Sequence, residues 1–388
     1  MAMEFRVLDE NFNVYDVIDN YESAIWTIRF SEAGDFEIYT PVTTQLLDSM
    51  RIGWYLFSDK FYDSVTDTAH LMIIETIEIE SDPENGNKIK ITGRDLDSLL
   101  TRRIVWGQKN FATGTNVATI VQTILNENVI NPSDWSRTYQ AGDGGTVTVS
   151  VSGADRKIDN FVLKPITGTF KNITGDLQLD GNEIYEVLNE LCQNYKFGYE
   201  VLYNFTTGKF EFELKNYRDC TYQQTDNPAI LFSPAFENIK NSNYLESSSN
   251  EKNSALIGGE GDEFNIMYQV YGSGKGLDRR EVFISGSDVN QKDDSTGGMV
   301  SNRTYLNMLL EKGKTEMLNY IYTQTYEGTA ETSRGYNYPD DFTIGDVVEI
   351  INEWGISAEV LVSEVVLSNS TSGYSIIPTF AAIEKGGE

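Results

Sequence analysis

Histidine and cysteine are nearly absent from this sequence, which argues against several kinds of reactive site. His70 is the single histidine among 388 residues, so a histidine-based catalytic scheme could use no other imidazole. Cys192 and Cys220 are the only cysteines, which argues against a disulfide framework and a cysteine-based zinc site. His70 begins a strand-like run, and Cys192 lies among apolar residues of an expected helix. We therefore expect Cys192 to behave as a small buried apolar residue, and His70 to be a packed or surface residue.

Long apolar runs are also missing. No stretch reaches the ~18 consecutive apolar residues that a membrane-spanning helix needs, so we expect no membrane span. The N-terminal stretch MAMEFRVLDENFNVYD is acidic and mixed, and it does not resemble a signal peptide. The sequence therefore predicts a protein that is made and assembled in a cytoplasm.

Basic residues are scarce, with 30 lysines and arginines against 59 acidic residues and a net charge of −29. The acid excess is concentrated at the two ends of the chain. Residues 1–98 hold 20 acidic and 7 basic residues, and residues 324–388 hold 11 acidic and 2 basic residues. Such ends repel nucleic acid rather than bind it. The acids either keep the protein soluble or form a surface that DNA passes without sticking.

Alternation of apolar and polar residues at both ends of the chain predicts antiparallel β structure. Near the C-terminus, the expected strands are 324–333, 346–351, 356–368 and 374–381. Between the two ends, apolar residues at helical spacing predict three helices. The first follows a cap at Thr115 or Asn116, the second contains 184–191, and the third covers 302–322. The fold class is therefore β-rich α+β, with acidic β regions on either side of an α+β region.

Two short motifs resemble ligand-binding loops, but each lacks required residues. DLQLDGNE places Asp176, Gln178 and Asp180 at alternating positions of a calcium loop, yet its twelfth position is Val187 rather than Glu. We expect a turn there, with Asn182 capping the next helix. GSGKG at 272–276 lacks the earlier glycine and the following hydroxyl residue of a phosphate loop. No metal, cofactor or catalytic residue is predicted.

The stretch YNYPDDFTIGDVVEII, residues 336–351, predicts a structural corner rather than a binding loop. Pro339 restricts the backbone at a turn, and Gly345 permits a bend at positive φ. Asp346 can accept hydrogen bonds from neighbouring backbone N–H groups. The strand that follows should pair with residues 358–367. Pro339, Gly345 and Asp346 are therefore candidate structural residues that require no ligand.

Four stretches together resemble the hub proteins of tailed-phage baseplates and tail tips, a tail-associated family of siphophages and phage-tail-like particles. They are YESAIWTIRFSEAGDFEIYTP, ITGRDLDSLLTRRIV, GKGLDRREVFISGSDV and YPDDFTIGDVVEIIN, which begin at residues 21, 91, 274 and 338. Each motif is short. Their order and spacing match the family over the whole length of the chain.

The resemblance implies two antiparallel β-barrels like those of tail-tube proteins, with an inserted α+β region. The implied domains are a first barrel at 1–104, an inserted α+β domain at 105–235, a second barrel at 236–262 with 322–388, and a further insertion at 263–321 with loops and a helix. Three chains would then form a ring of six barrels. Such a ring would continue a sixfold tail tube into a threefold tip.

The resemblance also implies partners and a location. The expected partners are two further copies of the chain, the tail tube or distal tail protein, the tape measure protein, and receptor-binding or spike subunits, with DNA only as passing cargo during genome ejection. The protein would lie in the virion tail tip or baseplate after assembly in the bacterial cytoplasm, and it would not be an enzyme. The alternative is a secreted β-protein that binds or cleaves polysaccharide. The missing signal peptide counts against it.

Overall fold

The computed structural model describes residues 3–82, 86–142, 144–262, 265–293, 297–330, 335–371 and 373–382. Contacts between residues divide the chain into two compact units. Unit 1 comprises Met1–Ser98, Gly198–Leu245 and Gln324–Glu388, and unit 2 comprises Leu99–Phe197 and Glu246–Thr323. Both acid-rich ends of the chain therefore belong to unit 1.

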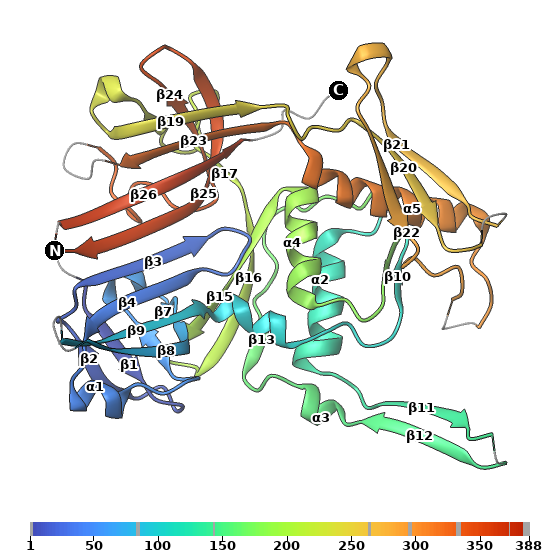
Figure 1. Ribbon diagram of the computed structural model, residues 1–388, viewed down its shortest axis with the longest axis horizontal. Helices are drawn as coiled ribbons and strands as arrows, with labels where there is room; N and C mark the ends of the chain where they lie inside the picture. Colours follow the sequence, from blue (N-terminus) through green and yellow to red (C-terminus); the bar gives the residue numbers. More distant parts are fainter. Residues whose placement is uncertain are drawn as a thin grey trace. The chain divides into compact units, whose positions relative to one another are not determined.

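A large, mainly antiparallel sheet dominates unit 1 (Figure 1). Its hydrogen-bonded order among the described residues is β19-β23-β26-β25-β3-β4-β9-β8-β5-β1-β2. In chain order these strands are β1 Phe5–Leu8, β2 Val14–Ile18, β3 Ser23–Arg29, β4 Asp35–Pro41, β5 Tyr55–Phe57, β8 Met72–Asp82, β9 Gly86–Asp95, β19 Ile239–Ser247, β23 Thr323–Ala330, β25 Ser357–Ser370 and β26 Gly373–Ala382. A further strand, β24 Asp346–Ile351, pairs with β25 and with the short parallel strands β17 Arg218–Asp219 and β18 Leu231–Phe232.

The C-terminal part of the structure confirms the strands predicted from the alternation of apolar and polar residues. β24 has the predicted bounds and pairs with β25 in antiparallel register, as expected. β25 begins one residue after the predicted strand and ends two residues beyond it, and β26 extends one residue beyond its prediction at each end. The first of the four predicted strands corresponds to β23, and its last residues, 331–333, lie outside the described residues.

One long strand, β25, joins the C-terminal part of the large sheet to the N-terminal part. Its first residues pair with β24, and its residues from Glu364 onward pair with β3. Its pairing with β26 shifts register between Val362 and Glu364. The β25–β3 register runs from Glu364 opposite Arg29 to Ser370 opposite Ser23. Arg29 Nε lies 2.6 Å from Glu364 Oε2 at this junction. Within the described residues the strand order does not return on itself, so two closed barrels stay a prediction.

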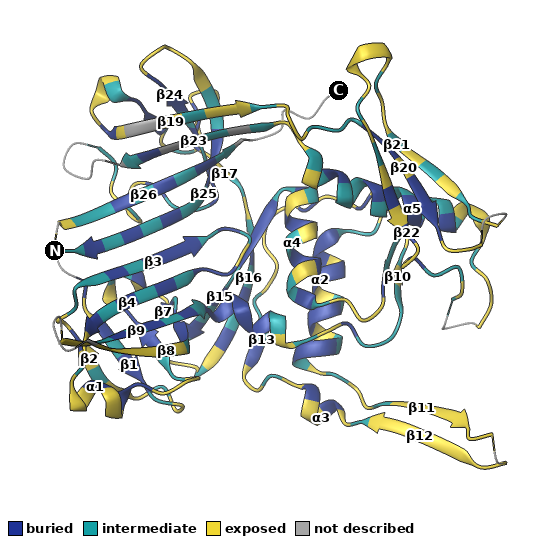
Figure 2. Ribbon diagram, in the orientation of Figure 1, coloured by how far each residue is buried: buried dark blue, intermediate teal, exposed yellow. Residues whose placement is uncertain are grey.

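The core of unit 1 draws on both ends of the chain, because inward-facing positions alternate along every strand. Trp26 of β3 is fully buried between the rings of Phe5 and Phe61, with centroids 5.6 and 5.2 Å away. Phe232 and Phe380, from distant parts of the sequence, lie 5.2 Å apart in the same apolar cluster. Figure 2 shows this alternation as dark and light bands along the strands.

A smaller set of elements completes unit 1. The strands β6 Tyr62–Asp63, β7 Thr68–Ala69, β15 Phe197–Asn204 and β16 Lys209–Asn216 belong to a second sheet, and α1 covers Thr44–Ser49. The 3-10 helix η2, Leu96–Arg102, follows β9, and its residues from Leu99 onward belong to unit 2. The segment Gly198–Leu245 makes its contacts in unit 1, whereas the resemblance placed 198–235 in the inserted domain. The four-part domain division is finer than these two units and stays a prediction.

Unit 2 contains the three predicted helices, α2 Val117–Leu125, α4 Ile184–Tyr195 and α5 Asn302–Met317, together with the single turn α3 Gly153–Arg156. Asn116 caps α2 as predicted, since its Oδ1 accepts a hydrogen bond from Ala118 N at 3.1 Å. The third helix ends before residue 322, because a 3-10 turn at Leu318–Tyr320 follows α5. Among the described residues, none of the helices combines the length and apolar character that crossing a membrane requires.

Short strands form the rest of unit 2. They are the pair β10 Lys109–Phe111 and β14 Leu177–Leu179, the hairpin β11 Trp135–Gln140 and β12 Thr146–Val151, the strand β13 Phe161–Leu163, and the three-stranded sheet of β21 Tyr268–Gly272, β20 Ser254–Gly259 and β22 Glu281–Gly286. Helix α5 packs against one face of the three-stranded sheet. Ile257, Tyr305 and Leu309 are buried between them. The β11–β12 hairpin is exposed along most of both strands (Figure 2).

Candidate functional site

The predicted corner begins with a turn at residues 338–341. The peptide bond between Tyr338 and Pro339 is cis. Asn337 and Asp341 hold the turn: Asn337 N donates to Asp341 Oδ2, and Asp341 N donates to Asn337 O, both at 2.8 Å. Phe342, directly after the turn, is fully buried. The turn is therefore anchored to the core by the apolar residue that follows it.

Gly345 bends the chain into β24 at a φ of +87°, the positive value that the sequence predicts. Its N–H donates to Val362 O at 2.9 Å, and its carbonyl accepts from Arg218 N at 3.0 Å. A Cβ at this position would lie 2.2 Å from Cε2 of Phe30, which is itself buried. Two separate constraints, backbone conformation and close packing, therefore require glycine here.

Asp346 is completely buried, and its charge is matched by Arg218. Arg218 Nε and Nη2 donate to the two carboxylate oxygens at 2.6 Å each, and Thr343 N donates to Oδ2 at 2.9 Å. The Thr343 bond is the local turn contact expected from the sequence. The bidentate ion pair was not predicted, because Arg218 lies 128 residues earlier and no local pattern marks it.

The structure thus brings Pro339, Gly345 and Asp346 together in one turn-to-strand connection. Both carboxylate oxygens of Asp346 already accept hydrogen bonds, and the adjacent guanidinium neutralises its charge. These contacts support a purely structural corner. That role stays a prediction, and substitutions at Gly345 and Arg218 test it.

Two further buried carboxylates, Asp95 and Asp97, lie where β9 enters η2. Asp95 accepts from Gly34 N at 2.7 Å and from Asp97 N at 3.1 Å, and Asp97 accepts from Val201 N at 2.6 Å. They tie η2 to the β3–β4 turn and to β15. Burial raises the pKa of Asp95 to about 7. Burial, followed by the charge of Asp95, raises the pKa of Asp97 well above its usual value. The sequence gives no sign that Asp95 and Asp97 are buried, apart from their position beside leucines.

We expect this pair to make the stability of unit 1 depend on pH. Because the pKa of Asp95 is raised on folding, the folded state keeps a proton that the unfolded state has already lost. The stability contribution is therefore present at low pH and is lost as pH rises through about 7. Lowering the pH from 8 to 6 should raise the free energy of unfolding by roughly 1 kcal/mol, measured by urea denaturation.

The variant Asp95→Asn should lose this gain, since its side chain has no proton to take up. Asp48→Asn, which removes an exposed acid from the same unit, serves as the matched control and should keep the pH dependence. Equal pH dependence in Asp95→Asn and Asp48→Asn would show that overall charge, rather than the buried pair, causes the effect.

The remaining sequence candidates are scattered. His70 Nε2 lies 3.6 Å from Glu200 Oε2, and burial lowers the pKa of His70, so it is a packed residue as expected. The cap of α4 was wrongly predicted: Glu183 occupies the cap position, while Asn182 Oδ1 accepts from Asp180 N at 2.8 Å. The Asn182 side chain is turned back onto its own turn, and no side-chain hydrogen bond among the described residues caps α4. Trp354, at the β24–β25 turn, is 86% exposed, unlike the buried Trp26.

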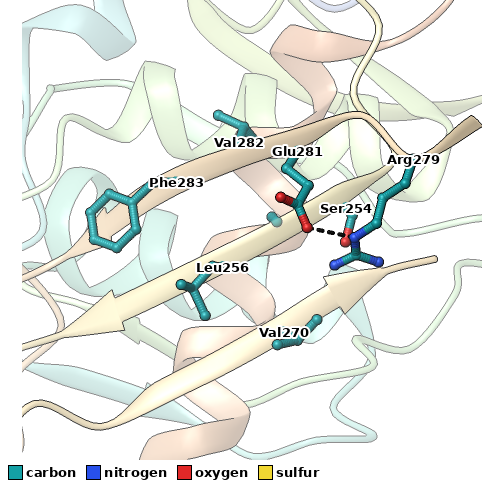
Figure 3. A pocket seen from close by; sticks show the side chains of 8 residues that line it. Ser254, Leu256, Val270, Arg279, Glu281, Val282 and Phe283 are labelled. Carbon is teal, nitrogen blue, oxygen red and sulfur yellow. Dashed lines mark hydrogen bonds and ion pairs between the residues drawn. The ribbon is translucent and has the colours of Figure 1, made fainter. Parts of the chain in front are cut away.

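The outer face of the three-stranded sheet in unit 2 carries exposed apolar side chains (Figure 3). Leu256 of β20 stands between Val270 of β21 and Phe283 of β22 in directly paired positions. Arg279 pairs with Glu281 at one end of this row, with Nε 2.5 Å from Oε1. The opposite face of the sheet is covered by α5, so the outer face is the one left to solvent.

Comparison with known proteins agrees with this architecture. The model of the family described as Siphovirus ReqiPepy6 Gp37-like protein matches residues 4–380. The tail protein from Neisseria meningitidis MC58 has a similar structure, with a TM-score of 0.55 at 13% identity over 100% of this chain and 98% of that chain. The 43 kDa tail protein of prophage MuSo2 from Shewanella oneidensis gives 0.55 at 12% identity over 98% of each chain.

At these identities the two structures establish a shared fold alone. Among curated proteins, none matches the chain. The family model covers nearly the whole sequence, including residues 4–98 and 324–380 of the two acid-rich ends. The protein therefore belongs to the Siphovirus ReqiPepy6 Gp37-like family of siphovirus tail proteins.

Proposed function

We propose that three copies of this chain form a hub ring at the tip of a phage tail, which continues the tail tube and changes its symmetry from sixfold to threefold. Membership of a tail protein family supports a structural component of the virion tail rather than an enzyme. The ring would surround a passage for the tape measure protein and DNA. It would assemble in the host cytoplasm.

The pairing of β25 with β3 is the observation that carries this proposal. It places the N-terminal and C-terminal β regions edge to edge within one continuous sheet. A chain that holds two sheet regions side by side can occupy two of the six positions around a tube, so three chains complete the circle. The predicted domain division has the same arrangement, because it assigns one tube-like region to 1–104 and the other to 236–262 with 322–388.

The acid excess supports a passage for DNA. Both acid-rich ends fall in unit 1, the unit that contains the large sheet. DNA carries one negative charge per ~1.7 Å of its axis, so basic groups on a wall would retain it and acidic groups would repel it. Screening limits this repulsion to about 8 Å at physiological salt, so only acids that face the passage can act. We propose that many acids of 1–98 and 324–388 do so.

The proposed partners follow from the position at the tail tip. The ring would contact the tail tube or distal tail protein on one side and receptor-binding or spike subunits on the other. The tape measure protein would end within it. Exposed apolar residues such as Trp354 and Phe283 are available for contacts of this kind.

The oligomeric state tests the proposal. Light scattering on purified protein should give three times the mass of the chain, or a monomer that becomes a trimer when tail tube or tape measure protein is added. Electron micrographs viewed along the axis should show a ring with an open centre. A stable dimer contradicts the proposal, because no threefold ring can be built from it. A channel wall that is neutral or basic on balance contradicts the role given to the acids.

A further inference from the structure

The β11–β12 hairpin of unit 2 exposes an apolar face. Its register places Val147 opposite Tyr139 and Val149 opposite Arg137, so these four side chains share one face. Tyr139, Val147 and Val149 are each more than half exposed. The other face carries only hydroxyl and amide side chains, from Ser136, Thr138, Gln140, Thr146, Thr148 and Ser150.

This hairpin is a two-stranded ribbon that is anchored at its base, where the rings of Trp135 and Trp106 lie 5.4 Å apart. A two-stranded ribbon alone is marginally stable in water and gains stability from further strands or from a packed surface. The alternation of apolar and hydroxyl residues gives the ribbon one face suited to contact and one suited to water. The pattern therefore favours a packing partner for the apolar face.

A second apolar face is the outer face of the three-stranded sheet. Val270, Leu256 and Phe283 stand in paired positions on neighbouring strands and line a groove of about 310 Å³ (Figure 3). The rings of Phe283 and Tyr268 lie over Gly258, since a Cβ there would be 2.9 Å from Cζ of Phe283 and 3.3 Å from Cε1 of Tyr268. All four apolar side chains are exposed.

Both faces are poor in charge. The strands β11, β12, β20, β21 and β22 contain two charged residues, Arg137 and Glu281, although 23% of the whole chain is charged. Each copy carries a net charge of −29, so two copies repel each other least where their surfaces are uncharged. Arg137 and Glu281 have opposite signs, and each lies two residues before an aromatic residue of its own face, Tyr139 or Phe283. The two faces therefore complement each other in charge.

The hairpin and the three-stranded sheet lie apart within unit 2 (Figure 1). A threefold ring has no twofold axis, so a contact between neighbouring copies away from the ring axis joins two different surfaces. A chain with one hairpin face and one sheet face supplies both halves of such a contact. Each copy would use each face once, and the contacts would close after three copies.

We propose that the apolar face of the β11–β12 hairpin packs on the outer face of the three-stranded sheet of the next copy in the ring. This contact rests on the proposed hub ring and names the surfaces that join its copies. Two β faces pack about 10 Å apart with their side chains interdigitated. The sheet of the next copy would then give the hairpin the packed surface that a two-stranded ribbon lacks.

Dissociation of the trimer on dilution, followed by light scattering, tests this contact. If the trimer needs tail tube or tape measure protein, that partner is kept at a fixed concentration throughout. Val149→Lys and Leu256→Glu should each raise the concentration of half-dissociation at least about tenfold, because each places a charge in an apolar contact. Ser150→Lys is the matched control. It adds the same charge to the hydroxyl face of the hairpin and should leave this concentration unchanged.

The three substituted residues are exposed, so each variant should unfold at the same urea concentration as the unaltered protein when both are monomeric. The double variant Val149→Lys/Leu256→Glu tests whether the two faces meet. Its introduced charges have opposite signs and would attract across the contact, so it should associate more tightly than either single variant. Losses that add in the double variant contradict the pairing of these faces.

The same measurements separate this contact from the hub ring itself. If the unaltered protein is a trimer and the single variants dissociate no more easily than it does, the ring stands and the proposed contact is wrong. If the unaltered protein forms a dimer that the single variants weaken and the double variant restores, the contact is supported and the threefold ring is contradicted. A chain that stays monomeric even with tail tube and tape measure protein contradicts both.

Discussion

Gly345→Ala should destabilise unit 1 by roughly 2–5 kcal/mol, combining left-handed backbone strain with overpacking. The left-handed backbone alone accounts for about 1–2 kcal/mol when a Cβ is added. The rest comes from Phe30, whose ring atom would lie 2.2 Å from the new Cβ. Phe30 is buried and cannot swing into solvent, so either its ring or the backbone of the corner must move. Urea denaturation measures the loss.

Gly355→Ala is the matched control for this prediction. Gly355 lies in the β24–β25 connection at a φ of +77°, but a Cβ there would meet nothing within 4 Å. Gly355→Ala should therefore cost only the backbone strain, about 1–2 kcal/mol. Adding Phe30→Leu to Gly345→Ala should recover part of the larger loss. If Gly345→Ala is silent, the corner is not structural and a ligand role must be reconsidered.

Arg218→Ala should destabilise the protein by about 3 kcal/mol, because it leaves the carboxylate of Asp346 buried without its cation. This is the low end of the range for broken buried pairs, since 45% of the Arg218 side chain is exposed and solvent weakens the interaction. The remaining donor, Thr343 N, cannot neutralise the charge. The free energy of unfolding in urea measures the effect.

Arg6→Ala is a suitable comparison, because Arg6 is similarly exposed, at 38%, but its partner Asp59 is 59% exposed rather than buried. We expect a loss of about 0–1 kcal/mol there, as for other surface ion pairs. The double variant Arg218→Ala/Asp346→Asn should be more stable than Arg218→Ala alone, since the uncompensated charge is gone. A double variant as unstable as the single one would show that packing of Arg218, rather than its charge, matters.

Asp346→Asn illustrates how the structure changes an expectation from sequence. The local pattern suggests a mild effect, because an amide oxygen can still accept from Thr343 N. In the folded protein the amide nitrogen would face the guanidinium of Arg218, which has lost its bidentate acceptor. We therefore expect Asp346→Asn to be costly as well.

The sequence by itself determined the elements that depend on residues close together in the chain. The helices α2, α4 and α5 follow from apolar residues at 3–4 spacing, and the Asn116 cap follows from a residue two positions before the N–H that it bonds. The strands β24, β25 and β26 follow from alternation, and the bend at Gly345 follows from a glycine between two strand-like runs. Each depends on contacts among residues a few positions apart.

Only the tertiary structure decided the features that depend on residues far apart in the chain. Arg218 meets Asp346 across 128 positions, Glu364 meets Arg29 across 335, and Glu311 meets Tyr195 across 116. Alternation shows that a segment is a strand but does not identify its neighbour, so the joining of the two ends through β25 and β3 could not be predicted from local pattern. Burial of Asp95, Asp97 and Glu311 has the same origin, because an acid becomes buried only when distant apolar surfaces close around it.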